Sequence, residues 1–180
     1  DPYDIYQMNK HLGVKFEELL NHKISLHVEE GLILPNLKMQ GKEDGCAFLN
    51  EKGRCTIHAF RPGFCRLFPL GRIYEDGSFS YYLQSQECTK ANRTKVKVNK
   101  WLGIPDLKQY ENFVNEWHYF LKDTKVLLLR LSDAQLNQEL SMYLLNRFYT
   151  TAFDLEIDFY KQFDERMIQM KKLIYTLGRQ

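Results

Sequence analysis

Residues 55–69 of this sequence read CTIHAFRPGFCRLFP. Two cysteines, Cys55 and Cys65, flank an Arg-Pro-Gly turn in a stretch where most globular chains would carry leucine or valine. The remaining two of the 4 cysteines are Cys46 and Cys88, so the whole set falls in the first half of the chain. This clustering favours one common purpose for the thiols.

The spacing C-x8-C-x9-C-x22-C leaves three interpretations open. The thiols are small buried apolar side chains, partners in disulfides, or ligands of a metal or cluster. The C-x2-C knuckles that are typical of structural zinc sites are absent. Widely spaced ligands occur where separate loops converge on a metal or an iron–sulfur cluster.

Basic residues and glycines surround the cysteines, with Arg54, Arg61 and Arg66 close to them in sequence. Thiolates around a zinc ion or an oxidised four-iron cluster carry net negative charge, which is costly to bury without nearby cations and amide donors. Arg61 and Arg66 are therefore candidate cofactor-binding residues, and the pattern favours a metal or cluster over disulfides. His58 is a weaker candidate ligand, because a lone histidine in a turn more often forms hydrogen bonds.

The composition indicates a globular protein without a charge signature. The 180 residues are 44% hydrophobic, which is enough for a packed core, and 25 basic against 23 acidic residues leave a net charge of +2. This balance gives no reason to expect nucleic acid or a membrane as a partner. We expect a cytoplasmic protein. Because Asp1 is not a methionine, we also expect the chain to be a trimmed or processed product.

Sequence patterns predict an α+β fold that is mainly α and changes character near residue 100. Residues 1–100 should form a loop-rich cysteine-cluster, metal-binding region with short helices at 4–11 and 15–21. Strand material there turns at Glu30-Gly31, and Asp76-Gly77 lies at the centre of a β-hairpin. Residues 101–180 should form a helical region that packs on the first region as one domain.

Apolar residues spaced by three and four predict about three helices in the second half. Pro105 suits the first turn of the first, which should run for about seven turns. Ser132 and Gln135 form a capping-box signature ahead of the second. The third should carry an apolar stripe from Leu155 to Ile174, which we interpret as core packing.

Residues 45–71, GCAFLNEKGRCTIHAFRPGFCRLFPLG, carry a family pattern. They resemble the YkgJ-like proteins, the CxxCxxCC zinc- or iron-chelating family that includes flagellin lysine N-methylases. The matching elements are Gly45-Cys46 with Phe48-Leu49, then Gly53-x-Cys55-x-Ile57-His58, then Arg61-Pro62, Cys65-Arg66 and Phe68-Pro69. Residues 1–20 resemble the segment that follows the family's N-terminal CxxCxxCC cluster, which this chain lacks.

The resemblance implies that Cys46, Cys55, Cys65 and Cys88 bind a metal or cluster. An iron–sulfur cluster of the 4Fe-4S type is the preferred version, and zinc is the alternative. The family often has Cys-Pro-Gly where this chain has Cys88-Thr89-Lys90, so the sequence departs from the pattern at the fourth ligand.

Two alternatives to a plain metal-binding protein remain. Kinship alone implies a protein-lysine N-methyltransferase of the flagellin N-methylase type, which would use S-adenosylmethionine and a protein substrate such as flagellin. The other alternative is a zinc-stabilised interaction module that docks a protein through exposed aromatic residues, with Tyr81, Tyr82, Tyr119 and Tyr149 as candidates.

Overall fold

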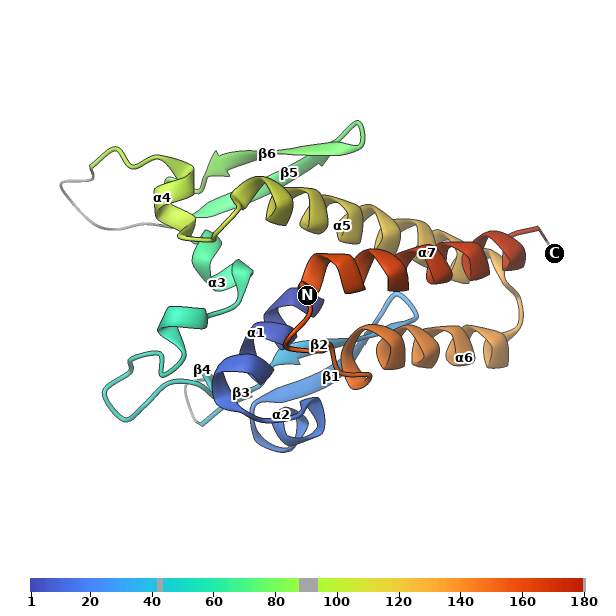
Figure 1. Cartoon of the computed structure of the whole chain (residues 1–180), viewed down its shortest axis with the longest axis horizontal. Coiled ribbons are helices and arrows are strands. Elements are labelled where there is room, and N and C mark those ends of the chain that lie inside the picture. The colour runs from blue at the N-terminus through green and yellow to red at the C-terminus, as the bar shows by residue number, and fades with distance from the viewer. Residues whose placement is uncertain (42–43, 88–93, 180) are drawn as a thin grey trace. The chain divides into compact units, whose positions relative to one another are not determined.

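The computed structural model describes residues 1–41, 44–87 and 94–179 (Figure 1). In chain order its elements are α1 (Pro2–Leu12), α2 (Phe16–His22), β1 (Ile24–Glu29), β2 (Leu32–Leu37), β3 (Met39–Gln40), β4 (Gly45–Cys46), the 3-10 turn η1 (His58–Phe60), α3 (Gly63–Leu67), β5 (Leu70–Glu75), β6 (Ser78–Leu83), α4 (Val98–Leu102), α5 (Leu107–Arg130), α6 (Ala134–Leu145), the π-helical turn η2 (Asn146–Thr150) and α7 (Phe159–Leu177). Short antiparallel hairpins in the first half and long helices in the second confirm the predicted α+β class.

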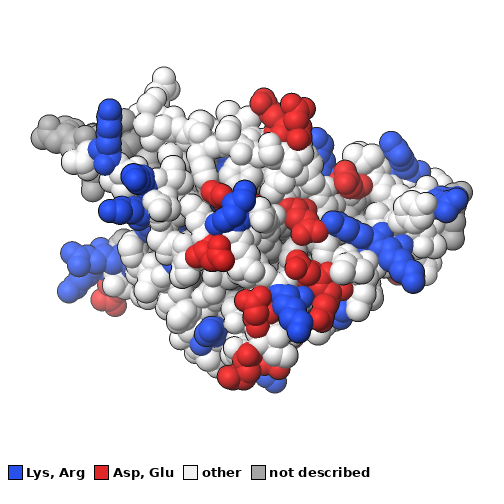
Figure 2. Space-filling view, turned by 45° about the horizontal axis from the view of Figure 1, so that its top comes forward, with Lys and Arg blue, Asp and Glu red and all other residues white. Residues whose placement is uncertain are grey.

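The chain forms two compact units. The first combines residues 1–60 with 120–180, and the second contains residues 61–119. Helix α5 contributes its first half to the second unit and its last turns to the first unit. No helix in the described part of the chain is long and apolar enough to cross a bilayer. On the face shown in Figure 2, acidic and basic side chains are interspersed.

In the first unit, β1 and β2 form a hairpin around the predicted two-residue turn. Glu30 and Gly31 both have positive φ, at 51° and 84°, as a type I′ turn requires. The hairpin is fixed to α6, because the backbone N–H of Ile33 donates to Ser141 Oγ at 2.7 Å. Ser141 is only 1% exposed, so this bond forms inside the unit.

The helical part of the first unit packs around aromatic side chains. Phe148 and Phe163 are fully buried, with ring centroids 5.7 Å apart. Phe120, at the start of the last turns of α5, lies 5.9 Å from the Phe148 ring. The predicted apolar stripes of the second half therefore do form a core, as their spacing indicated.

A buried arginine donates hydrogen bonds to the backbone that follows α6. Arg166 on α7 is 7% exposed, and its guanidinium donates to three backbone carbonyls, those of Arg147 at 2.8 Å, Thr151 at 2.7 Å and Ala152 at 2.7 Å. Its Cζ also lies 3.7 Å from the centroid of the Phe153 ring. Burial, and then the charge of Arg147, lower the pKa of Arg166 to about 10, so the group stays charged at neutral pH.

In the second unit, the β5–β6 hairpin is held by the first half of α5. Its turn, Asp76-Gly77, also has positive φ at both residues. The Gly77 N–H donates to Tyr119 Oη at 3.1 Å, and Asn115 Nδ2 donates to the Gly77 carbonyl at 2.7 Å. Sequence predicted this hairpin correctly, because a two-residue Asp-Gly turn is a strong local signal.

Three details of the helical half differ from expectation. Helix α5 begins at Leu107, so Pro105 precedes its first turn. The N-cap of α6 is Asp133 rather than Ser132, since the Asp133 carboxylate accepts the backbone N–H groups of the first turn. Leu155 lies before α7 and is exposed, so the buried stripe starts at Phe159.

We expect Arg166→Met to lower the free energy of unfolding by about 3 kcal/mol, because it leaves buried carbonyls without their charged donor. The stability of Arg166→Lys should lie between that of the parent and that of Arg166→Met, since an ammonium cannot reproduce the planar guanidinium. Urea unfolding followed by circular dichroism measures both. The control is Lys172→Met, an exposed change on the same helix that should alter stability by less than about 0.5 kcal/mol. Equal losses in Arg166→Met and in this control would contradict the role assigned to Arg166.

Candidate metal centre

Residues 46–56 form a loop that is closed by its own hydrogen bonds at the base. The backbone N–H of Thr56 donates to the Phe48 carbonyl at 2.8 Å, and Thr56 Oγ1 donates to the same oxygen at 2.9 Å. Leu49 and Cys55 form an antiparallel bridge. The loop therefore holds Cys55 beside Leu49, which follows Cys46 closely in the chain.

The tip of this loop is built on Asn50. Its N–H donates to the Arg54 carbonyl at 2.9 Å, and its Oδ1 accepts the Arg54 N–H at 3.0 Å. Gly53 turns the chain at a φ of 69°, a conformation that suits glycine. Local polar contacts thus fix the path between the two cysteines.

Both cysteines of the loop lie at the edge of the core. Cys46 and Cys55 are half-buried, whereas Ala47, which follows the first, is 1% exposed and Ile57, near the second, is 2% exposed. Cys46 is also held by strand β4, which pairs with β3 through Met39. The buried neighbours anchor the backbone and leave the thiols partly accessible.

The thiols of Cys46 and Cys55 are free, with no disulfide to any described residue. This observation argues against the disulfide interpretation for this pair. Thiolate sulfur is the ligand type of structural zinc and of iron–sulfur clusters, so this donor set fits either group.

A lysine that sequence reasoning missed lies next to this loop. Lys23, at the C-terminal end of α2, donates from Nζ to the Ala47 carbonyl at 2.7 Å. The same ammonium lies 5.3 Å from the centroid of the Phe48 ring. A cation next to the Cys46 segment offsets the charge of an anionic centre. No local sequence signal marks Lys23, because it reaches the loop only through the fold.

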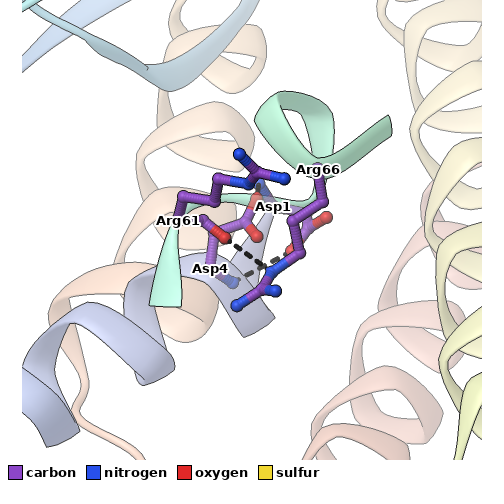
Figure 3. Close-up of polar contacts among 4 residues, drawn as sticks. All are labelled: Asp1, Asp4, Arg61 and Arg66. Atoms are coloured by element: carbon purple, nitrogen blue, oxygen red, sulfur yellow. Dashed lines mark hydrogen bonds and ion pairs between the residues drawn. The ribbon is translucent and has the colours of Figure 1, made fainter. Parts of the chain in front are cut away.

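Cys65 belongs to the second unit, where it is half-buried on the short helix α3. The next residue, Arg66, donates from Nε to the Arg61 carbonyl at 3.0 Å and from Nη1 to the Leu102 carbonyl at 3.4 Å. Figure 3 shows the first of these bonds, and also the Asp1 and Asp4 cap of α1 in the other unit. Arg66 thus links α3 to α4. That Arg61 and Arg66 contact a bound cofactor stays a prediction.

The four predicted ligands lie in separate parts of the chain, with Cys46 and Cys55 in the first unit and Cys65 in the second. Cys88 lies outside the described residues. Among the described residues, no group of three or more His, Cys, Asp or Glu side chains is arranged to hold a metal ion. His58 lies in η1, beside the cysteine loop in sequence. Binding through Cys46, Cys55, Cys65 and Cys88 therefore remains a prediction.

The four tyrosines considered for a docking surface differ in exposure. Tyr149 is 3% exposed, so its place among the exposed aromatics is wrong. Burial, and then the charge of Asp4, raise its pKa. Tyr81 and Tyr119 are half-buried, and burial raises the pKa of Tyr81 to about 12. Tyr82, at 43%, is the only exposed side chain of this set.

Free, half-buried thiols on a closed loop beside a lysine define a candidate cysteine-type metal-binding domain. Residues 2–100 match the family described as "CxxCxxCC: Putative zinc- or iron-chelating domain". The match covers more than half of the chain, and the protein belongs to this family. No curated protein and no solved structure is significantly similar to the chain.

We expect Lys23→Met to weaken metal binding about tenfold, since it keeps the aliphatic stem but removes the charge beside the Cys46 segment. Competition with a chromophoric zinc chelator measures the affinity. Lys52→Met, in the exposed tip of the same loop, is the matched control and should bind as the parent does. If the two variants bind equally well, Lys23 does not assist the site.

Proposed function

We propose that this protein holds an iron–sulfur cluster of the 4Fe-4S type, with Cys46, Cys55, Cys65 and Cys88 as ligands from this chain. The observation that carries the proposal is the pair of free, half-buried thiols on the 46–56 loop, beside the ammonium of Lys23. Family membership supplies the coarser statement, zinc or iron chelation.

Spacing supports a cluster over zinc. The loop presents Cys46 and Cys55 through hydrogen bonds of its own backbone rather than through the tight C-x2-C turn of zinc knuckles. Iron–sulfur ligands with long gaps between them are common. A bound cluster would supply one-electron transfer, or a covalent staple for a loop-rich region.

In this proposal the residues act as metal ligands, as anchors of the ligand segments, or as a source of compensating charge. The cysteine thiols lose their protons and bind, which makes binding dependent on pH. Ala47 and Ile57 anchor the ligand segments in the core. Lys23 supplies compensating charge from outside the loop.

We expect the protein purified without oxygen to be brown, with a broad absorbance near about 400 nm and with iron and sulfide in equal amounts. Cys46→Ala and Cys55→Ala should each remove most of this absorbance and of the bound iron, as measured by elemental analysis. His58→Ala is the control and should keep the iron.

A colourless protein that carries stoichiometric zinc would overturn the cluster and leave zinc chelation as the function. Metal content that is unchanged in both cysteine variants would show that the ligand assignment is wrong. Lysine N-methylation, S-adenosylmethionine and a flagellin substrate rest on kinship, with no observation of their own in the described residues.

A further inference from the structure

One edge of the β1–β2 hairpin is closed by the protein itself, and the other is not. The turn residues Glu30 and Gly31 make Glu29 and Leu32 a hydrogen-bonded pair. Pairs then alternate along an antiparallel ladder, so Val28↔Ile33 and Leu26↔Pro35 are non-hydrogen-bonded pairs. The N–H and C=O groups of these residues point away from the partner strand.

On the β2 side the outward N–H positions are accounted for. The Ile33 N–H donates to Ser141 Oγ of α6 at 2.7 Å, which also confirms the outward direction. Pro35 has no N–H to offer. Buried cover and a proline are the usual ways in which proteins protect an edge strand.

On the β1 side the outward backbone groups of Leu26 and Val28 have no hydrogen-bond partner within the described part of the chain. The side chains on the same strand are open as well, since Leu26 is 40% exposed and Val28 is 73% exposed. Strand β1 itself contains neither a proline nor a lysine, although Lys125 of α5 pairs with Glu29 at its end. An open edge of this kind is a template for another strand.

We propose that β1 pairs with β1 of a second copy of this chain, antiparallel and about a two-fold axis at His27. In this register Leu26 lies opposite Val28 of the other copy, and Val28 lies opposite Leu26. The outward N–H groups of Leu26 and Val28 in each copy then meet the outward C=O groups of Val28 and Leu26 in the other copy. Registers shifted by two residues pair fewer of these groups, because Ile24 is buried and Glu30 lies in the turn.

The side chains agree with this register. Leu26 and Val28 of the two copies form aliphatic cross-strand pairs on one face. On the other face Ser25 lies opposite Glu29, so the acidic residues at the hairpin tip do not face one another. The same surface is used by both copies, as a two-fold interface requires. The product is a four-stranded sheet, which is more stable than an isolated two-stranded hairpin.

Sedimentation velocity of the full chain tests the proposal. Because the paired surface is small, we expect a weak dimer, with a dissociation constant of about 10 µM. Val28→Lys places a charge on the edge and should weaken the dimer at least about tenfold. Ile168→Lys, on exposed α7, is the matched control and should leave it unchanged. A parent protein that stays monomeric at about 200 µM overturns the proposal, as does a dimer that Val28→Lys leaves intact.

Cross-linking tests the register independently. In the proposed dimer, position 27 of one chain lies opposite position 27 of the other in a non-hydrogen-bonded pair. The Cβ atoms of such a pair are close enough for a disulfide in the His27→Cys variant. Oxidised glutathione should therefore link this variant into covalent dimers beyond the parent level. Ser25→Cys, which faces Glu29 instead, is the control and should not link. Equal linking of the two variants, or none in His27→Cys, excludes the two-fold register.

Discussion

The carbonyls that follow α6 need donors inside the core, and the guanidinium of Arg166 supplies them. One side chain from α7 binds carbonyls of Arg147, Thr151 and Ala152, and this fixes how the chain passes from α6 to α7. Buried charge is stable there only because every bond is charge-assisted and the ring of Phe153 covers one face of the group. The position of α6 in turn sets the hairpin, through the bond from Ile33 to Ser141.

The cysteine loop is organised on a different principle. Its shape comes from short-range bonds around Asn50 and Thr56, which need little from the rest of the fold. Its electrostatics come from far along the chain, because Lys23 reaches Ala47 from α2. A thiolate site needs both properties, since ligands must be fixed and their charge must be balanced.

Features with local signals could be predicted from the sequence. The turns at Glu30-Gly31 and Asp76-Gly77, and the helices marked by apolar spacing, are confirmed by the structure. The N-cap of α6 is one residue after the predicted Ser132, because Ser132 and Asp133 are both good caps and only the fold selects between them. Tyr149 is buried through tertiary packing, which the sequence pattern does not show. Lys23 and Arg166 were missed for the same reason, since their partners lie far away in sequence. The cysteines were recognised by their pattern, whereas their joint ligation stays a prediction.

Because hydrogen bonds close the base of the cysteine loop, the position of Cys55 does not depend on how many residues the tip of the loop contains. The bridge between Leu49 and Cys55 and the bonds of Thr56 set where Cys55 lies. Glu51, Lys52 and Gly53 are exposed beyond those bonds, and a Cβ on Gly53 would meet no other atom. Residues inserted at this tip would lengthen the interval between Cys46 and Cys55 at little entropic cost and leave both sulfurs in place. The tip of the loop is therefore a natural place for a label or an epitope.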